Sequence, residues 1–538
     1  MTSDRTAPNF LVFVTDQHRA DHLGCYGNPI VRTPHIDQLG ADGWRFERNY
    51  VASPICMPNR GSMMTGRMPS IHGARGNGVP LPLESVTFAD VLGEFGYRTA
   101  LIGKSHLQNM EEQPPVLPKA NNPPGARSGA RFPESRKAGI EGAEYRQEMS
   151  GSWRDPDHRL TLPYYGFQEV VLCNGHADEC FGDYECWLRD KHPEVHARRG
   201  RDASPRDPGY VAPQAWKTPL DEFQYPTHFI ADSARQWLRR HAEQRAAEPF
   251  ALICSFPDPH HPWTPPGKYW GMFDPDLMPV SPNARPEAYR ERHVEWLWQE
   301  RADQKARLDS PRLFAANVRE IQEIIALTYG MIANIDDRIA MIMQTLGECG
   351  LDENTVVIFT SDHGDLMGDH GLVLKGPLHY QGLVRVPLIW REPPTSSSEE
   401  GPRVRQDLSS SLDLATSILR RANINPPNGF QGKALFDADG QPVPSGRAAV
   451  LIEESQQRAY LGFEQAVQVR TVVSDRYRLS FYREGDWGEL YDLQADPRET
   501  TNLWDVPEAA PIRAEMVERL ARLIIEHAEN SPRPTRLA

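Results

Sequence analysis

The stretch SPICMPNRGSMMTGR, residues 53–67, is the one from which the rest of the chain is best understood. Pro58 suits the first turn of a helix, because its fixed φ is already helical and no amide proton is needed there. We therefore predict a loop that runs into a helix, with Cys56 just ahead of the helix and facing its free N–H groups. Arg60 follows about one turn later and can fold back toward Cys56. These features predict an anion-receiving site that is built around one side chain.

A lone cysteine is more often a small, inert core residue than a reactive one. The neighbours of Cys56 argue against that interpretation, because the pattern C-x-P-x-R, continued as G-S-M-M-T-G-R, resembles the signature of the type I sulfatases of the alkaline phosphatase superfamily. In that family a separate formylglycine-generating enzyme converts the cysteine to Cα-formylglycine, whose hydrated aldehyde is the nucleophile. The resemblance covers roughly the whole chain and is weakest between residues 107 and 222.

Composition excludes several classes of protein. The 538 residues are enough for a large core and more than one domain. The formal net charge of −14 argues against nucleic acid or an anionic membrane as partner. No apolar run approaches the length of a membrane span, and the polar start, residues 1–9, does not resemble a signal peptide. Seven cysteines without framework spacing fit a reducing compartment, so we expect a cytoplasmic protein.

Alternating strand and helix patterns predict a doubly wound α/β fold. Continuous apolar runs are typical of parallel strands that are buried on both faces, and such runs cover residues 9–15, 97–102, 249–256 and 355–360. We expect a large mixed sheet flanked by helices, the catalytic sulfatase domain, over residues 1–435. Within it, residues 107–222 are rich in proline, glycine and charge, which is typical of a lid or substrate wall. Residues 436–538 predict a small α+β domain with a short antiparallel sheet, one helix and a tail.

Three further elements are expected in the large domain. Helices should fill residues 286–347, a strand should cover 384–390, and a helix should cover 406–421. In the segment 107–222, Cys173, Cys180 and Cys186 occur with His176, but their spacing matches no common zinc pattern.

Polar side chains follow each of the four buried runs, and others lie on adjacent loops. Each has an ordinary structural explanation, such as a helix cap or a structural histidine. Because the carboxyl ends of parallel strands meet at one edge of a sheet, we expect these residues to converge on one site. The residues are Asp16, Gln17, Cys56, Asn77, Lys104, His106, His260, Asp362, His363 and Lys375. Carboxylate and amide oxygens with an imidazole suit a divalent cation such as Ca²⁺, Mg²⁺ or Mn²⁺.

By the resemblance, one divalent cation is held by Asp16, Gln17, Asp362, His363 and an oxygen of the modified Cys56. Many sulfatases carry two adjacent acids in place of Asp16 and Gln17, and an Asp-Asn pair in place of Asp362 and His363. The pairs of this chain look more like those of phosphonate monoester hydrolases and choline sulfatases. We expect Ca²⁺, and the loss of one formal charge among the ligands makes Mn²⁺ and Mg²⁺ competitive alternatives.

The same resemblance implies a role for each remaining residue. Arg60 and the metal lower the pKa of one hydroxyl of the formylglycine diol, which attacks sulfur. Lys104 and Lys375 hold the sulfuryl oxygens. His260, with Lys375, assists departure of the alcohol. His106 takes a proton from the second hydroxyl, so that the hemiacetal collapses and expels sulfate.

These roles predict a hydrolase of small-molecule sulfate monoesters, with side activity on phosphate and phosphonate esters. The nearest alternative is a phosphonate monoester or phosphodiester hydrolase with the same site, and Asn77 aligns with a substrate-contacting residue of those enzymes. Lys104 and His106 favour the sulfatase, because phosphonate hydrolases carry neutral residues there. A silent binding protein is disfavoured, since every expected polar residue is present, and a cysteine phosphatase would need a glycine-rich loop and no metal ligands. A homo-oligomer is compatible with the sequence.

Overall fold

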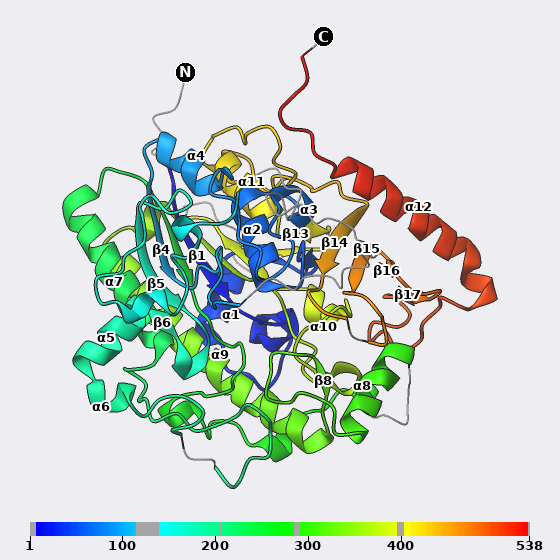
Figure 1. Ribbon diagram of the computed structural model, residues 1–538. Coiled ribbons are helices and arrows are strands. Elements are labelled where there is room, and N and C mark those ends of the chain that lie inside the picture. The colour runs from blue at the N-terminus through cyan, green and yellow to red at the C-terminus, as the bar shows by residue number, and fades with distance from the viewer. Residues whose placement is uncertain are drawn as a thin grey trace, which may run out of the picture.

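The computed structural model describes residues 7–113, 139–204, 207–284, 291–394, 403–459 and 461–535, so part of the segment 107–222 lies outside the described residues. A nine-stranded sheet runs through the larger part of the protein (Figure 1). Its order is β12 (Arg403–Arg405), β2 (Trp44–Phe46), β11 (Leu388–Arg391), β9 (Thr355–Ser361), β1 (Asn9–Thr15), β7 (Phe250–Ser255), β4 (Arg98–Gly103), β5 (Glu169–Asn174) and β6 (Phe181–Gly182).

The five central strands, β9, β1, β7, β4 and β5, are parallel, whereas β11 pairs antiparallel to β9. Successive residues of β1 enter different cores, because a strand points its side chains alternately to the two faces of a sheet. Leu11 and Phe13 belong to one core, and Phe10, Val12 and Val14 belong to the other. Burial on both faces explains why the strands are continuous apolar runs in the sequence.

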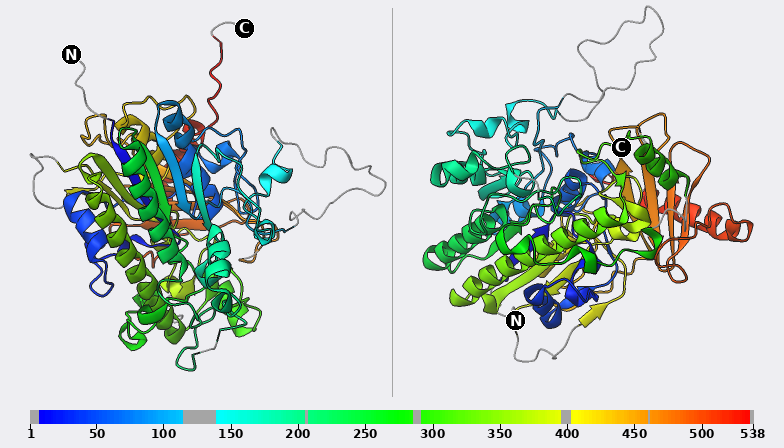
Figure 2. Two further views of the ribbon diagram at one scale, coloured as in Figure 1. Left: turned by 90° about the vertical axis from the view of Figure 1, so that its left-hand side faces the viewer. Right: turned by 90° about the horizontal axis from the view of Figure 1, so that it is seen from below.

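Helices cover both faces of the sheet, as the two views in Figure 2 show. The core with Leu11 is closed by α1 (Pro34–Asp42), α7 (Pro226–Arg245) and α9 (Val318–Glu348). The opposite core is closed by α2 (Cys56–Thr65), α4 (Phe88–Glu94) and α11 (Asp413–Arg421). The starts of α4 and α9 carry capping boxes, formed by Thr87 with Asp90 and by Asn317 with Glu320.

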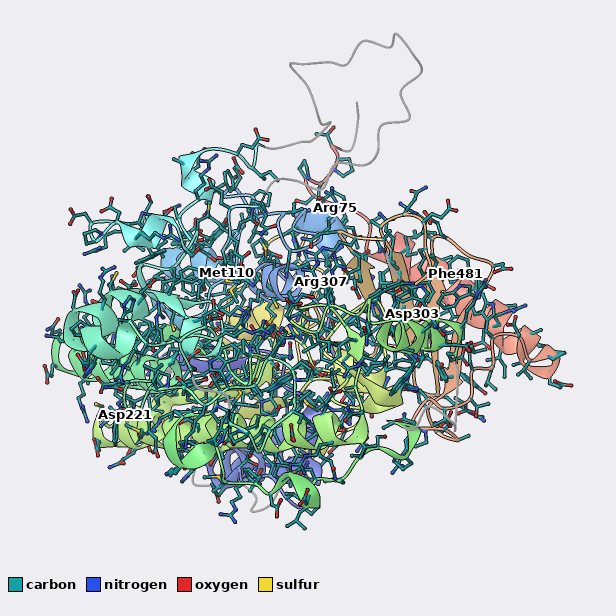
Figure 3. All side chains as sticks on the ribbon, turned by 60° about the horizontal axis from the view of Figure 1, so that its bottom comes forward. Arg75, Met110, Asp221, Asp303, Arg307 and Phe481 are labelled. Atoms are coloured by element: carbon teal, nitrogen blue, oxygen red, sulfur yellow. The ribbon has the colours of Figure 1, made fainter. Side chains whose placement is uncertain are left out.

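A second, four-stranded antiparallel sheet lies to one side of the large sheet (Figure 1). It consists of β14 (Ala449–Ser455), β15 (Gln468–Ser474), β16 (Tyr477–Tyr482) and β17 (Gly488–Asp492), and α12 (Ala510–Glu526) packs across it. Phe481, on the outside of β16, is half-exposed beside Trp504 (Figure 3). The expected fold class is confirmed, whereas the boundary at residues 435/436 stays a prediction.

Several helices and strands have other bounds in the structure than the sequence predicted. Residues 107–222 supply two strands of the large sheet, β5 and β6, and the helix α5 (Asp183–Lys191), because the short run EVVLCN pairs with β4 and β6. The strand expected over 384–390 begins only after Pro387, which lacks an amide proton, and residues 381–384 form α10 (Gln381–Val384). The helix expected over 406–421 begins at Asp413, since β13 (Ser409–Ser410) pairs with β3 (Asn49–Tyr50).

The helices expected over 286–347 are present, but they do not fill the region, of which residues 286–290 lie outside the described residues. The two helices are α8 (Arg292–Ala302) and α9, and residues between them include β8 (Phe314–Ala315), which pairs with β10 (Leu372–Val373). Within the described ranges, no helix combines the length and apolar character needed to cross a lipid bilayer. All seven cysteines lie in these ranges, and each is unpaired.

Candidate functional site

The carboxyl ends of the five parallel strands converge on one buried site. Asp16 directly follows β1, Lys104 follows β4, and Asp362 follows β9. His260 lies on the loop after β7, and His176 lies on the loop after β5. This is the edge at which open α/β sheets bind ligands, because loops from neighbouring strands meet there.

Helix α2 brings Cys56 to this edge. Cys56 is the first residue of the helix, not the residue just ahead of it, because Ile55 takes the extended N-cap conformation. Asn59 joins the helix to its surroundings: its Oδ1 accepts from Ser411 Oγ at 2.7 Å, and its Nδ2 donates to the backbone oxygen of Asp362 at 2.5 Å. The start of α2 is therefore tied to the end of β9.

Four potential metal ligands surround one point. The ligand atoms of Asp16, Cys56, Asp362 and His363 all lie within 4.8 Å of one another, and all four residues are buried. Sγ of Cys56 is 3.2 Å from Nε2 of His363. Nδ1 of His363 is 2.8 Å from the backbone oxygen of Gly364, which orients the ring so that Nε2 faces the cluster.

Gln17 supplies a further oxygen beside this cluster. Its backbone lies in the left-handed region, with φ of 64°, and its N–H donates to Oδ1 of Asp362 at 3.2 Å. Its Nε2 is 3.3 Å from Nδ1 of His261, whereas its buried Oε1 has no hydrogen-bond partner among the described residues. An unpartnered amide oxygen next to two carboxylates and an imidazole fits a divalent cation with oxygen and nitrogen ligands.

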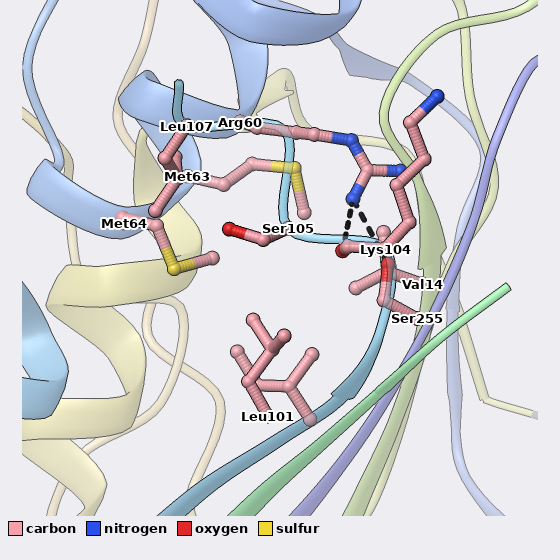
Figure 4. Close-up of a pocket in the computed structure, with 10 residues that line it drawn as sticks. Val14, Arg60, Met63, Met64, Leu101, Lys104, Ser105, Leu107 and Ser255 are labelled. Carbon is pink, nitrogen blue, oxygen red and sulfur yellow. Dashed lines mark hydrogen bonds between the residues drawn. The ribbon is translucent and has the colours of Figure 1, made fainter. Parts of the chain in front are cut away.

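Arg60 is directed at the carboxylates. Its Nε donates to Oδ2 of Asp362 at 2.8 Å, and its Nη2 lies 3.8 Å from Oδ2 of Asp16. Its Nη1 donates to the backbone oxygen of Lys104 and to Oγ of Ser255, each at 2.9 Å (Figure 4). The rest of the pocket in Figure 4 is mostly apolar and is lined by Val14, Met63, Met64, Leu101, Leu107 and Ile253. Because that wall offers few polar partners, the guanidinium stays turned toward the two acids.

Two lysines approach the cluster from different loops. Lys104 forms an ion pair with Asp16, and its Nζ is 2.8 Å from Nε2 of His176. Nζ of Lys375 is 3.1 Å from Sγ of Cys56 and 2.8 Å from Nε2 of His260. The group at position 56 is therefore bordered by buried positive charge.

The charges at the site shift one another's pKa values. Burial and Asp16 oppose ionisation of Cys56, but attraction from Lys375 and His363 lowers its pKa. Burial also disfavours ionised Asp16, but attraction to Lys104 outweighs it and holds the pKa of Asp16 well below its usual value. Burial and Lys375 oppose charge on His363, but neighbouring anions raise its pKa to about 10. A metal ion that binds His363 must therefore displace a proton, since only the neutral ring is a ligand.

His106 lies on the loop after β4, and Asn77 lies on the loop that leads to α4. His106 is buried with φ of 54°, and burial followed by the charge of Lys104 holds its pKa well below the usual value. The ring is therefore held neutral, and its buried Nδ1 has no hydrogen-bond partner among the described residues. Oδ1 of Asn77 accepts from the N–H of Met57 at 3.2 Å, one residue beyond Cys56.

Two histidines of the site were missed in the sequence. The ring of His176 stacks on that of His260, with centroids 3.6 Å apart, and His261 stacks on the other side of His260 at 4.0 Å. His176 therefore belongs to this site, whereas Cys173 and Cys180 are buried core residues. The sequence signal for His176 is its position just after the short apolar run that forms β5.

Comparison with known proteins gives consistent matches over most of the chain. The profile of the sulfatase family matches residues 8–424, and the profile described as N-sulphoglucosamine sulphohydrolase, C-terminal, matches residues 368–526. An arylsulfatase of Clostridium perfringens is 26% identical over 531 residues, which cover 97% of this chain and 94% of that protein.

Two further similar proteins are not described as sulfatases. The multifunctional alkaline phosphatase superfamily protein PehA of Trinickia caryophylli is 24% identical over 551 residues, which cover 98% of this chain and 97% of that one. The crystal structure of the phosphonate monoester hydrolase of Agrobacterium radiobacter superposes with a TM-score of 0.74 at 25% identity, and the match covers 99% of this chain and 98% of that one.

Proposed function

The chain belongs to the sulfatase family, and from this premise we propose that it hydrolyses sulfate monoesters of small molecules at the site around Cys56. The observation that carries the proposal is the pair of lysines. Nζ of Lys375 lies 3.1 Å from Sγ of Cys56, and Lys104 pairs with the adjacent Asp16. A sulfuryl group transferred to residue 56 would meet fixed positive charge, which stabilises the negative charge that develops in the transition state.

Members of this family use a formylglycine residue and a divalent metal. We propose that the formylglycine-generating enzyme forms this residue from Cys56, and that its hydrated aldehyde supplies the nucleophile. We propose Ca²⁺ as the metal, with Mn²⁺ and Mg²⁺ as alternatives, held by Asp16, Gln17, Asp362, His363 and residue 56. When bound, the cation supplies positive charge that lowers the pKa of a hydroxyl group and offsets charge on the sulfuryl oxygens.

Lys375 and His260 are proposed to assist the departing alcohol. Nζ of Lys375 is 2.8 Å from Nε2 of His260. Burial opposes the charge of Lys375, but Cys56 and the nearby acids raise its pKa. Burial, followed by His176 and Lys375, holds the pKa of His260 well below its usual value. In this proposal Lys375 provides the proton for the leaving oxygen, and neutral His260 orients its ammonium group.

The remaining residues are proposed to act around this reaction. Neutral His106 accepts the proton that is released when sulfate is expelled. Arg60 forms ion pairs with the two metal-binding carboxylates and holds them in place. His176 orients Lys104, which lies 2.8 Å away. Asn77 is proposed to contact the substrate near the start of α2.

Hydrolysis of phosphonate monoesters or phosphodiesters at the same site is the second candidate. The metal cluster favours it, because Gln17 and His363 resemble the corresponding residues of phosphonate hydrolases. Lys104 and His106 favour sulfate esters and outweigh the cluster in this proposal, since they act on the transferred group rather than through the metal. Activity on phosphorus esters is expected as a side reaction, because the nucleophile, the metal and Arg60 do not distinguish sulfur from phosphorus.

The order of substrate preference is a direct test. The enzyme should show higher kcat/KM for 4-nitrophenyl sulfate than for the matching phosphate monoester or phosphonate monoester. Lys104→Ala should lower kcat/KM for the sulfate by about two orders of magnitude, the scale for removing one preorganised charge-stabilising group. Lys191→Ala, at the exposed end of α5, is the matched control and should leave it unchanged. If the enzyme without substitutions prefers the phosphonate ester, the sulfatase proposal is rejected in favour of the second candidate.

We further propose that residues 1–435 form the catalytic domain and residues 436–538 a small C-terminal domain. The location of His176 supports a role for residues 107–222 as a wall of the substrate site. Seven unpaired cysteines support a reducing compartment, and we propose the cytoplasm.

A further inference from the structure

We propose that the C-terminal four-stranded sheet acts in catalysis, because it positions Lys375 through His379 and Tyr482. The inference rests on the leaving-group role proposed above for Lys375. It assigns His379 and Tyr482 as positioning residues, which touch neither the substrate nor the group at position 56.

The side chain of Lys375 needs an accurately placed backbone. Its Nζ has three close neighbours, at 3.1 Å from Sγ of Cys56, 2.8 Å from Nε2 of His260 and 3.0 Å from Nε2 of His363. A shift of the backbone at Lys375 would change the position of its ammonium group relative to these atoms, and a small misplacement of a catalytic group is enough to lower the rate. The preceding Leu374 is held with φ of 73°, and its N–H donates to Oδ1 of the buried Asp365 at 3.0 Å.

On the other side of Lys375, the chain is attached to the C-terminal sheet. The hydroxyl of Tyr482 donates to the backbone oxygen of Pro377 at 2.8 Å. Nδ1 of His379 is 2.7 Å from Oγ1 of Thr471, and its Nε2 is 2.8 Å from Oε2 of Glu454. The side chains of these residues are buried, so a lost hydrogen bond here is not replaced by one to water.

The partners on the sheet are themselves immobilised by further buried hydrogen bonds. Oγ1 of Thr471 is 2.7 Å from Oγ of Ser480, which accepts from Nη1 of Arg478 at 2.7 Å. Arg478 is completely buried, and it pairs with Oε2 of Glu489 at 2.8 Å and also with Glu499. Glu454, Thr471, Ser480 and Glu489 lie on β14, β15, β16 and β17, so every strand of the sheet takes part. Such a network transmits a rigid position, because moving one member breaks several bonds.

Another hydrogen bond between the C-terminal sheet and the rest of the protein provides a control. On α3 (Pro69–His72), Oγ of Ser70 donates to Oε1 of Glu453 at 3.0 Å. This bond also links the C-terminal sheet to the larger part of the protein, but it does not touch residues 374–381. Ser70→Ala therefore removes a hydrogen bond between the same two parts of the protein, at an exposed residue, without acting on Lys375.

The dependence of rate on the leaving group distinguishes positioning from stability. Loss of folded enzyme lowers the rates of all esters by one factor, whereas a displaced Lys375 slows esters with poor leaving groups more than activated ones. The quantity measured is the ratio of kcat/KM for 4-nitrophenyl sulfate to that for phenyl sulfate. All samples are the full chain with equal formylglycine content at residue 56, and the thermal midpoint of each is recorded.

Lys375→Ala should raise this ratio by about tenfold or more. His379→Ala should raise it in the same direction by about three- to tenfold, since a displaced catalytic group retains part of its effect. His379→Gln keeps a hydrogen-bonding side chain and should recover part of the loss. Tyr482→Phe removes only a hydroxyl group and should also raise the ratio, so it tests the inference if His379→Ala does not fold. Ser70→Ala should leave the ratio unchanged.

The experiment separates two statements, the leaving-group role of Lys375 and its positioning by the C-terminal sheet. A raised ratio in Lys375→Ala, with unchanged ratios in the variants of His379 and Tyr482, would overturn the inference and leave the role of Lys375 intact. An unchanged ratio in Lys375→Ala would show that its proposed leaving-group role is wrong, and the inference would fall with it.

Discussion

Replacing Cys56 by alanine should lower kcat for 4-nitrophenyl sulfate by about four to six orders of magnitude, the scale seen when an enzyme loses its covalent nucleophile. The reason is that residue 56 supplies the attacking group in the proposed mechanism, and no neighbouring lysine or histidine could replace it there. The measurement is steady-state kinetics at matched metal content. Circular dichroism of the same samples checks that the fold is retained.

A second cysteine gives the control for this experiment. Cys349→Ser changes a partly exposed cysteine at the end of α9, away from the site, and should leave kcat unchanged. Peptide mass spectrometry of active enzyme should find residue 56 lighter than cysteine and reactive toward hydrazide. Full activity in a sample that is wholly unmodified at Cys56 would contradict the mechanism.

Asp16→Asn and Asp362→Asn should reduce bound divalent metal and activity together. Both carboxylates lie in the buried cluster with Cys56 and His363, so each supplies charge and a ligand atom. We expect about one divalent ion per chain in active enzyme and only a small fraction of that in either variant. Turnover should fall by about two to three orders of magnitude. Asparagine keeps the volume of the side chain, which limits the loss of folding that alanine would cause beside Lys104 and Arg60.

The chain offers a matched control for the metal measurement. His35, Asp336 and Asp337 form a second group whose ligand atoms lie close together, at the start of α1 and on α9. Both oxygens of Asp336 already accept backbone N–H groups of α1. Asp337→Asn should therefore leave metal content and activity unchanged, as measured by elemental analysis of dialysed protein. Undiminished metal in both Asp16→Asn and Asp362→Asn would show that the proposed ligands are wrong.

The sequence by itself determined the class of fold and most of the residues that meet at the site. Strands β1, β7 and β9 are visible as apolar runs because both of their faces are buried. Asp16 and Asp362 follow such runs directly, and the topology of a parallel sheet brings their ends together. The motif around Cys56 is local, so it could be recognised without knowledge of any distant contact.

Only the tertiary structure decided which residues complete the site. Strand β5 lies near the edge of the sheet and its first half is only partly buried, so its apolar run is short and His176 was not connected with Lys104. The attachment of the Lys375 loop was equally hidden, since His379 pairs with Glu454 and Thr471, 75 and 92 residues away. Periodicity and local motifs report burial and backbone conformation, whereas hydrogen bonds between distant segments depend on how the two sheets pack, which no local pattern encodes.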